Sequence, residues 1–302
     1  MRKFIIKSIF FFLPLFFILI ILMELMLRNI PNDYNYKNQY LKNNSNSITK
    51  LFLGSSHTYY GINPKYISGK AFNASHISQT INLDIEILKK YRNNWKELKT
   101  IIIPIDYFTL FARLSKGKEK WRIKNYNLYY GMNLSNSLSN NLEIMNFSYK
   151  TNFKRIVSYY SQNKTSITCS ELGFGTNYKG NVDLIESGNT AALRHTKKDL
   201  PYLKESINIL NEILYFASKN NIEVIFYTSP AYKTYVSNLN EKQLNLTINK
   251  ITELADKNIN CTYINLLEDI RFSSNDFRDA DHLNPRGAKK LSEILDKLIS
   301  DR

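Results

Sequence analysis

Residues 48–57 have the sequence ITKLFLGSSH, a short apolar run with a β-branched start followed by a glycine, two serines and a histidine. The apolar run predicts a buried β-strand over residues 48–53 that ends in a tight turn at Gly54. Similar runs follow along the chain, and amphipathic segments with helical spacing lie between them. Strands are therefore also predicted at 70–72, 100–105, 222–227 and 261–266, and helices at 77–95, 202–218, 244–255 and 285–298.

Strands that alternate with helices predict right-handed βαβ units. The expected fold class is therefore α/β, a three-layer domain over residues 48–302 with a central parallel sheet and helices on both faces. Residues 107–200 interrupt the alternation, because they are rich in Tyr, Asn and Ser and show no strong period. We interpret them as an insertion between two strands. Asn284 is placed to cap the last helix.

The chain is strongly basic, since 41 Lys and Arg against 26 Asp and Glu give 302 residues a formal net charge of +15. This charge favours an anionic neighbour, which would be nucleic acid, a membrane surface or an acidic polymer. With 43% hydrophobic and 22% charged residues, the chain can bury a core. Two cysteines exclude a disulfide-dense scaffold and a zinc ribbon, and the pairing of Cys169 with Cys261 stays open.

Residues 1–28 predict a cytoplasmic tip and a transmembrane anchor. The span from residue 8 to residue 23 carries no charge and extends in apolar character to Leu27, close to the ~20 residues that cross a bilayer. A cleavable signal peptide is the alternative, but no A-x-A-like site follows the apolar stretch. Arg2, Lys3 and Lys7 favour a cytoplasmic N-terminus. The polar, Asn-rich residues 29–47 are interpreted as a linker.

The predicted localisation is therefore the cytoplasmic (inner) membrane, crossed once, with the domain outside. A translocated domain does not meet nucleic acid, so the positive charge is better matched to a membrane surface or an envelope polymer.

Two tetrapeptides carry the candidate chemistry. Residues 54–57 (GSSH) follow the first strand, where ligands of open α/β sheets bind, and residues 279–282 (DADH) precede the last helix. An Asp three positions before a His can accept from one ring nitrogen and leave the other as a base. Ser56 as nucleophile, His282 as base and Asp279 as orienting acid form the set that acyl transfer requires.

Each tetrapeptide alone is also common as an ordinary turn or helix cap, and the pair is the informative observation. Asp281 is the alternative carboxylate, with a poorer geometry beside His282. His57 contacts substrate or makes a structural hydrogen bond at the turn. His76 and His195 have no metal ligands at suitable spacing, so neither a metal nor a cofactor is expected. The tyrosines of the insertion either stack on sugar rings or are ordinary packed aromatics.

The two tetrapeptides together resemble the SGNH/GDSL hydrolase superfamily, whose first block is a G-D-S-like turn and whose last is D-x-x-H. The order of predicted strands and helices resembles that of the superfamily over residues 48–302. The resemblance implies that Ser56 is the nucleophile, His282 the base and Asp279 the orienting acid. A G-S-S-H turn behind one N-terminal anchor is similar to the membrane-tethered branch of this superfamily. That branch includes proteins of alginate acetylation and teichoic-acid D-alanylation.

The sequence departs from this superfamily in the two middle blocks. Where N-x-G is usual, the chain has Asn73-Ala74-Ser75, so the resemblance assigns the oxyanion amide to Ser75. Where G-x-N-D is usual, the chain has Pro104-Ile105-Asp106-Tyr107, which lacks the oxyanion-binding Asn. Gly54, His57 and Asp106 are the further residues expected near the oxyanion or substrate.

The resemblance implies an acyl (acetyl) transferase or esterase that acts on a cell-envelope polysaccharide. Its partners would be the glycan, an acyl donor and a polytopic membrane O-acyltransferase that delivers the donor. The alternative, which the missing Asn favours, is an inactive SGNH-like scaffold or glycan-binding protein of polysaccharide assembly.

The basic N-terminus and single apolar span predict the topology of the chain. A reporter that is active only in the cytoplasm should stay dark when it is fused after Arg302. Activity of that fusion would contradict both the anchor and an envelope function.

Overall fold

The computed structural model describes residues 1–178, 180 and 182–300. The chain divides into two compact units. Unit 1 comprises Met1–Asn38 and Lys118–Ile167, and unit 2 comprises Gln39–Gly117 and Thr168–Arg302. The segment expected as an insertion, 107–200, is thus shared between the units. Its Lys179 and Asn181, and the last two residues of the expected domain, lie outside the described residues.

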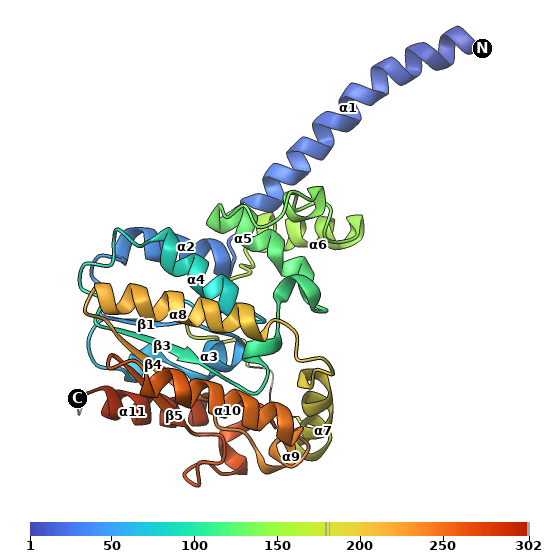
Figure 1. Cartoon of the computed structure of the whole chain (residues 1–302). Helices are drawn as coiled ribbons and strands as arrows, with labels where there is room; N and C mark the ends of the chain where they lie inside the picture. The colour runs from blue at the N-terminus through green and yellow to red at the C-terminus, as the bar shows by residue number, and fades with distance from the viewer. Residues whose placement is uncertain (179, 181, 301–302) are drawn as a thin grey trace. The chain divides into compact units, whose positions relative to one another are not determined.

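Unit 2 is built on a five-stranded, fully parallel sheet with the strand order β2-β1-β3-β4-β5 (Figure 1). Each strand lies within two residues of a predicted apolar run, because a strand buried on both faces needs continuous apolar side chains. The strands are β1 (Lys50–Phe52), β2 (Ala71–Asn73), β3 (Thr100–Pro104), β4 (Glu223–Thr228) and β5 (Cys261–Asn265).

Helices cover both faces of this sheet, which confirms the three-layer α/β fold class. Figure 1 shows α4 and α8 on one side of the sheet and α11 on the other. The helices of unit 2 are α3 (Ser56–Gly61), α4 (Ile81–Lys90), α7 (Leu184–His195), α8 (Leu203–Lys219), α9 (Lys233–Val236), α10 (Glu241–Asp256) and α11 (Pro285–Ser300). A small antiparallel hairpin, β6 (Phe277–Asp279) and β7 (His282–Leu283), precedes α11.

The core beside α11 joins the two ends of unit 2. Phe52 of β1 and Ile102 of β3 share one buried cluster with Leu291 and Leu295 of α11. Burying such side chains stabilises the fold by roughly 1.5–3 kcal/mol each. The Asn284 side chain accepts the N–H groups at the start of α11, as predicted for its cap.

The strand order reverses direction between β1 and β3, since β2 lies on one side of this pair and β4 on the other. At such a switch point the loops after the two strands diverge and leave a crevice at their carboxyl ends. Ser56 follows β1 and Asp106 follows β3, so both come to this edge.

Unit 1 contains α1 (Arg2–Arg28), α5 (Ile123–Tyr130) and α6 (Tyr149–Tyr160). Among the described residues, one helix is long and apolar enough to cross a membrane, over Ile6–Arg28. The segment expected as a linker, 29–47, contains a further helix, α2 (Asp33–Asn44), in which Tyr34 and Leu41 are buried.

At Gly54 both the backbone conformation and the neighbouring atoms require a glycine. Its φ is +113°, and a Cβ there would lie 2.4 Å from Pro104 Cγ. Gly54→Ala should therefore lower the free energy of unfolding by roughly 2–4 kcal/mol, measured by denaturant titration of the full chain in detergent.

Gly61→Ala is the matched control, because a Cβ there meets only Leu291 and Leu283 side chains, at 3.7 and 3.8 Å. Its effect should be small or stabilising, since alanine favours a helix. Equal losses in the two variants would contradict the steric argument.

Candidate active site

Ser56 lies at a sharp strand–turn–helix junction. β1 ends at Phe52, Gly54 turns the backbone, and α3 begins at Ser56. The Ser55 side chain accepts the His57 N–H and caps the helix. The first N–H groups of a helix have no acceptor within the helix, so the turn presents the Ser56 amide beside the Ser56 hydroxyl.

Ser56 and His282 are in direct contact, although 226 positions separate them in the sequence. The Ser56 Oγ lies 2.8 Å from His282 Nε2, and His282 Nδ1 lies 2.9 Å from Asp279 Oδ1. Because the carboxylate holds the proton on Nδ1, Nε2 keeps its lone pair and accepts from the Ser56 hydroxyl. The structure thus brings together the three residues that the sequence singled out, in the expected order.

Asp279 is held by the turn that it begins. Its Oδ1 also accepts the N–H groups of Asp281 and His282, at 3.2 and 2.9 Å. The alternative carboxylate, Asp281, lies 3.5 Å from His282 Nδ1. Asp279 therefore has the better geometry for orienting the imidazole.

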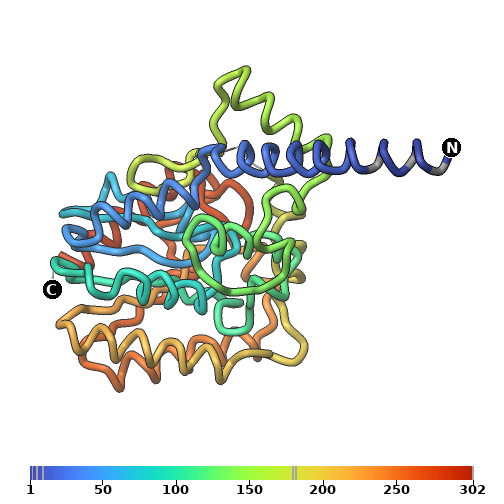
Figure 2. The backbone as a smooth tube through the Cα atoms, turned by 90° about the horizontal axis from the view of Figure 1, so that it is seen from above, coloured from blue at the N-terminus to red at the C-terminus, as the bar shows by residue number. Residues whose placement is uncertain are grey.

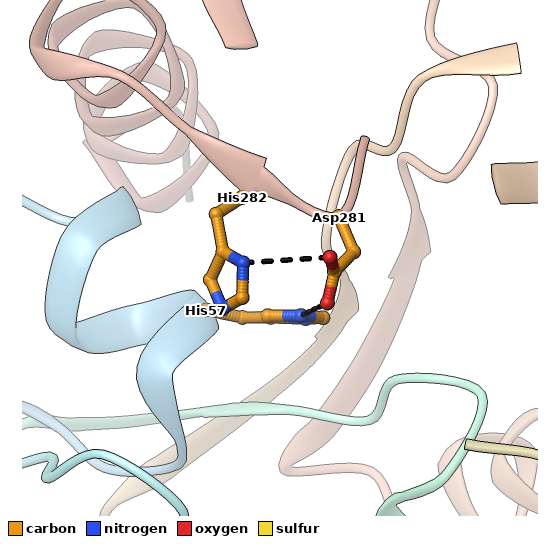
Figure 3. A group of neighbouring side chains, drawn as sticks. All are labelled: His57, Asp281 and His282. Carbon is orange, nitrogen blue, oxygen red and sulfur yellow. Dashed lines mark hydrogen bonds and ion pairs between the residues drawn. The ribbon is translucent and has the colours of Figure 1, made fainter. Parts of the chain in front are cut away.

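Asp281 instead bridges two imidazoles. Figure 3 shows its carboxylate between the rings of His282 and His57. Its Oδ2 lies 3.4 Å from His57 Nε2 and 3.2 Å from an Arg194 nitrogen. Burial raises the pKa of Asp281, but the charges of His282 and His57 outweigh it and hold that pKa well below its usual range.

His57 is buried with a carboxylate at each ring nitrogen. Its Nδ1 lies 2.8 Å from Asp106 Oδ2, and Asp106 Oδ1 accepts the Ser229 N–H at 2.9 Å. Burial lowers the pKa of His57, but Asp106 and Asp281 outweigh it and raise the pKa to about 10. Both side chains are turned inward, so the structural alternative for His57 fits, and the substrate contacts predicted for His57 and Asp106 do not.

The amides predicted to surround the oxyanion also have internal partners. The Gly54 N–H donates to Asp84 Oδ1 at 2.9 Å, and the Ser75 N–H donates to Asn73 Oδ1 at 3.1 Å. Because an amide carries one hydrogen, neither is presented to a ligand in this state. The oxyanion role expected for the Ser75 amide stays a prediction, as does the place of Gly54 near the oxyanion or substrate, and the turn leaves the Ser56 N–H for the same role.

The reacting pair, Ser56 and His282, is more exposed to solvent than most of the residues around it. Ser56 and His282 are partly exposed, whereas His57, Asp106 and Asp281 are buried. Burial lowers the pKa of His282, and Asp281 and Asp279 outweigh it and raise that pKa. A substrate can therefore reach the Ser56 hydroxyl and its base, while the carboxylates act on them from behind.

Two side chains of α7, Arg194 and His195, complete the surroundings and were not predicted from the sequence. Arg194 pairs with Asp281, and His195 Nδ1 lies 2.9 Å from Tyr235 Oη. Burial lowers the pKa of His195 to about 3, so this imidazole is neutral. Both residues fall in 107–200, where no periodicity points to a helix.

His57, Asp281 and His282 also offer ligand atoms that lie within 4.8 Å of one another. The sequence predicted no metal site, from the spacing around His76 and His195. In the structure Asp281 contacts both imidazoles, and His282 Nδ1 is bonded to Asp279 as well. A cation would have to displace the His57 proton, so this set of donors fits a retained proton better than a metal.

No family model matches the chain, and no curated protein matches it. A solved structure from Streptococcus pneumonia, provisionally named a platelet activating factor, is similar at 12% identity with a TM-score of 0.45, over 95% of this chain and 97% of that one. Another, a provisional acylhydrolase from Bacteroides fragilis, is similar at 9% identity with a TM-score of 0.42, over 87% of this chain and 95% of that one. Similarity this distant assigns neither a family nor a function.

His57 should stay protonated at neutral pH, whereas His195 should stay neutral. Nitrogen NMR of the imidazoles at pH 8 should show two protonated nitrogens for His57, whose pKa is about 10. His195, with a pKa of about 3, is the internal control and should show the pattern of a neutral ring. Titration of His57 near its ordinary pKa of ~6.5 would contradict the paired-carboxylate geometry.

The same shift predicts the direction of a pH effect on stability. A raised folded-state pKa contributes stability that is full below the unfolded pKa of ~6.5 and is lost as pH rises toward about 10. The stability difference between the native chain and His57→Gln should therefore shrink between these values, measured by denaturant unfolding. A difference that is constant or grows with pH would contradict this linkage.

Proposed function

We propose that the protein transfers or removes an acyl group, with Ser56 as nucleophile, His282 as base and Asp279 as orienting acid. The observation that carries this proposal is the pair of contacts at 2.8 and 2.9 Å that link the three side chains. Nucleophile, base and orienter within hydrogen-bond reach are the arrangement that covalent acyl transfer requires.

In the first half of the reaction, Ser56 Oγ attacks the carbonyl carbon of the acyl donor while its proton passes to His282 Nε2. The carbonyl oxygen becomes an oxyanion next to the Ser56 N–H. When the tetrahedral intermediate collapses, the bond to the leaving group breaks and the leaving group takes the proton from His282. The product of this half is an acyl ester on Ser56.

In the second half, a sugar hydroxyl or water attacks the acyl ester and gives its proton to His282. Collapse returns that proton to Ser56 Oγ and releases the acylated sugar or the free acid. Transferase and esterase differ only in this acceptor. His282 is positively charged in both halves, and Asp279 and Asp281 stabilise that charge.

The proposed site of action is the cell envelope. The helix over Ile6–Arg28 would anchor the chain in the inner membrane, with the catalytic residues outside. The net charge of +15 favours an anionic envelope polysaccharide as the acceptor or substrate. The resemblance to the membrane-tethered SGNH branch favours acetyl as the acyl group and a polytopic membrane O-acyltransferase as the supplier.

One observation favours an inactive scaffold or glycan-binding protein as the second candidate. Asp106 lies in the segment where the SGNH pattern has its oxyanion-binding Asn. The Asp106 carboxylate is instead hydrogen-bonded to His57 and to the Ser229 N–H. With the Ser75 amide also engaged, the described oxyanion donors are fewer than that pattern provides.

Ser56→Ala should reduce hydrolysis of an aryl acetate by about 10³-fold or more and abolish labelling by a fluorophosphonate.

Asp279→Asn should reduce kcat by roughly 10²–10⁴-fold, because His282 would present the wrong tautomer. Turnover that rises with added glycan acceptor would identify a transferase.

Ser55→Ala is the matched control, since it removes a neighbouring hydroxyl and a helix cap but leaves the contact between Ser56 and His282. It should retain activity. A native chain without turnover or labelling, or equal losses in both serine variants, would favour the scaffold.

A further inference from the structure

Exposed aromatic side chains form a row on α6 in unit 1. Tyr149, Phe153, Ile156 and Tyr160 follow the spacing i, i+4, i+7 and i+11, which places them on one face of the helix. Ile156 is buried, yet Tyr149 and Phe153 on the same face are 73% and 63% exposed. We define the collar as this row's exposed residues with their exposed apolar neighbours: Leu138, Met145, Phe147, Tyr149, Phe153 and Tyr160.

The loop before α6 is fixed to one turn of α1. The Glu24 carboxylate accepts the N–H groups of Glu143 and Ile144, each at 2.9 Å. Arg28 also donates to this carboxylate and to the carbonyl of Asn141. The apolar side chains of this loop are therefore held at the level of the last turns of α1.

The helix α6 is fixed at the same level. Ile156 packs with Leu27 in one buried cluster, and Tyr160 Oη donates to the carbonyl of Met26 at 3.1 Å. Figures 1 and 2 both place α6 beside the C-terminal end of α1. The face that carries Ile156 and Tyr160 against α1 continues to Phe153 and Tyr149, where no protein covers it among the described residues.

That level coincides with the end of the apolar span. Large apolar side chains of α1 are exposed from Phe10 to Leu25, and the span over Ile6–Arg28 has 23 residues. At ~1.5 Å per residue, about 20 residues cross the ~30 Å of hydrocarbon. If Lys7 lies at one interface, residues 24–27 lie at the other.

The collar has the chemistry of that interface. Tyrosine rings lie at the boundary between acyl chains and headgroups, and helices that lie in this boundary bury phenylalanine and leucine side chains there. Lysine side chains extend from it toward phosphates. Lys150 and Lys154, both exposed, flank Phe153 on α6.

We propose that the collar lies in the headgroup region of the outer leaflet of the bilayer that α1 crosses. Unit 1 would then be held to the membrane by α1 and by a second, lateral contact. This inference rests on the membrane anchoring within the proposed function.

The test is depth-dependent quenching of tryptophan in the full chain, reconstituted in phosphatidylcholine–phosphatidylglycerol vesicles. Phe153→Trp reports on the collar, and Phe12→Trp reports on the middle of α1. Tyr215→Trp on α8 is the control, because its exposure of 66% matches the 63% of Phe153. The fluorescence of the unsubstituted chain, which has two tryptophans, is subtracted.

Phe153→Trp should lose a several-fold larger fraction of its fluorescence than Tyr215→Trp, and more to lipids brominated near the headgroup than near the methyl end. Phe12→Trp should show the reverse depth preference. Quenching of Phe12→Trp without quenching of Phe153→Trp would overturn the collar and leave the anchor intact. Quenching of neither would overturn the anchor and the collar together.

A protein partner would give a distinct result. If Phe153→Trp is unquenched by bromolipid in vesicles but shielded from aqueous iodide in native membranes, another protein covers the collar. That outcome would overturn the lipid contact. Equal quenching of Phe153→Trp and Tyr215→Trp would also overturn it, since lipid contact would then be unspecific.

Discussion

The charges gathered at the carboxyl ends of β1 and β3 have to balance, and the arrangement of the site depends on this constraint. Asp106, Asp279 and Asp281 supply three carboxylates within a small volume, and His57, Arg194 and Arg278 supply three opposing charges. A buried charge without a partner costs several kcal/mol. These residues come from separate loops and helices, so their pairing holds the turn after β1, the loop after β3, the β6–β7 hairpin and α7 together.

These carboxylates and cations sum to zero while His282 carries no proton. In the proposed reaction His282 gains a proton as Ser56 attacks, and the oxyanion that forms at the same time balances the new imidazolium. Asp279 and Asp281 already face His282 before the reaction, so its positive charge forms without reorganisation of the site. His57 is part of this arrangement because its Nε2 contacts Asp281 Oδ2, while Asp281 Oδ1 faces His282 Nδ1.

The strands of unit 2 could be predicted because each one is a local apolar run, and the sheet order then brings distant loops to one edge. Ser56, His282 and Asp279 were identifiable for that reason. The pairing of His57 with Asp106 followed from the same topology, since β1 and β3 are neighbours. The sequence analysis weighed His57 as a substrate contact or as a structural hydrogen bond at the turn, but it did not name Asp106 as the partner. The bridging by Asp281 could not be predicted, because it depends on the side-chain directions of a two-residue turn.

Amino-acid composition predicted the structure less well in segments where polar residues are buried against specific partners. Tyr34 lies in a segment whose Asn content indicated a linker, yet its ring packs edge-on against Tyr126 at 5.2 Å. Lys124 and Glu143, in the segment without a period, form a buried ion pair at 2.8 Å. Contacts of this kind join segments far apart in sequence, so no local sequence pattern predicts them.

Within the proposed function, the oxyanion donors bear on the choice between transferase and esterase. Loss of one donor from an oxyanion hole costs about 2.7–4 kcal/mol of transition-state stabilisation. The Ser56 N–H is the donor that the turn leaves available, since Ser75 and Gly54 donate elsewhere. A plain sugar ester has a poor leaving group and needs that stabilisation most, whereas an activated donor such as a thioester needs it less. An acceptor sugar can also bring hydroxyl donors of its own to Ser56. As part of the proposal, we therefore favour transfer from an activated donor over hydrolysis of a stable ester.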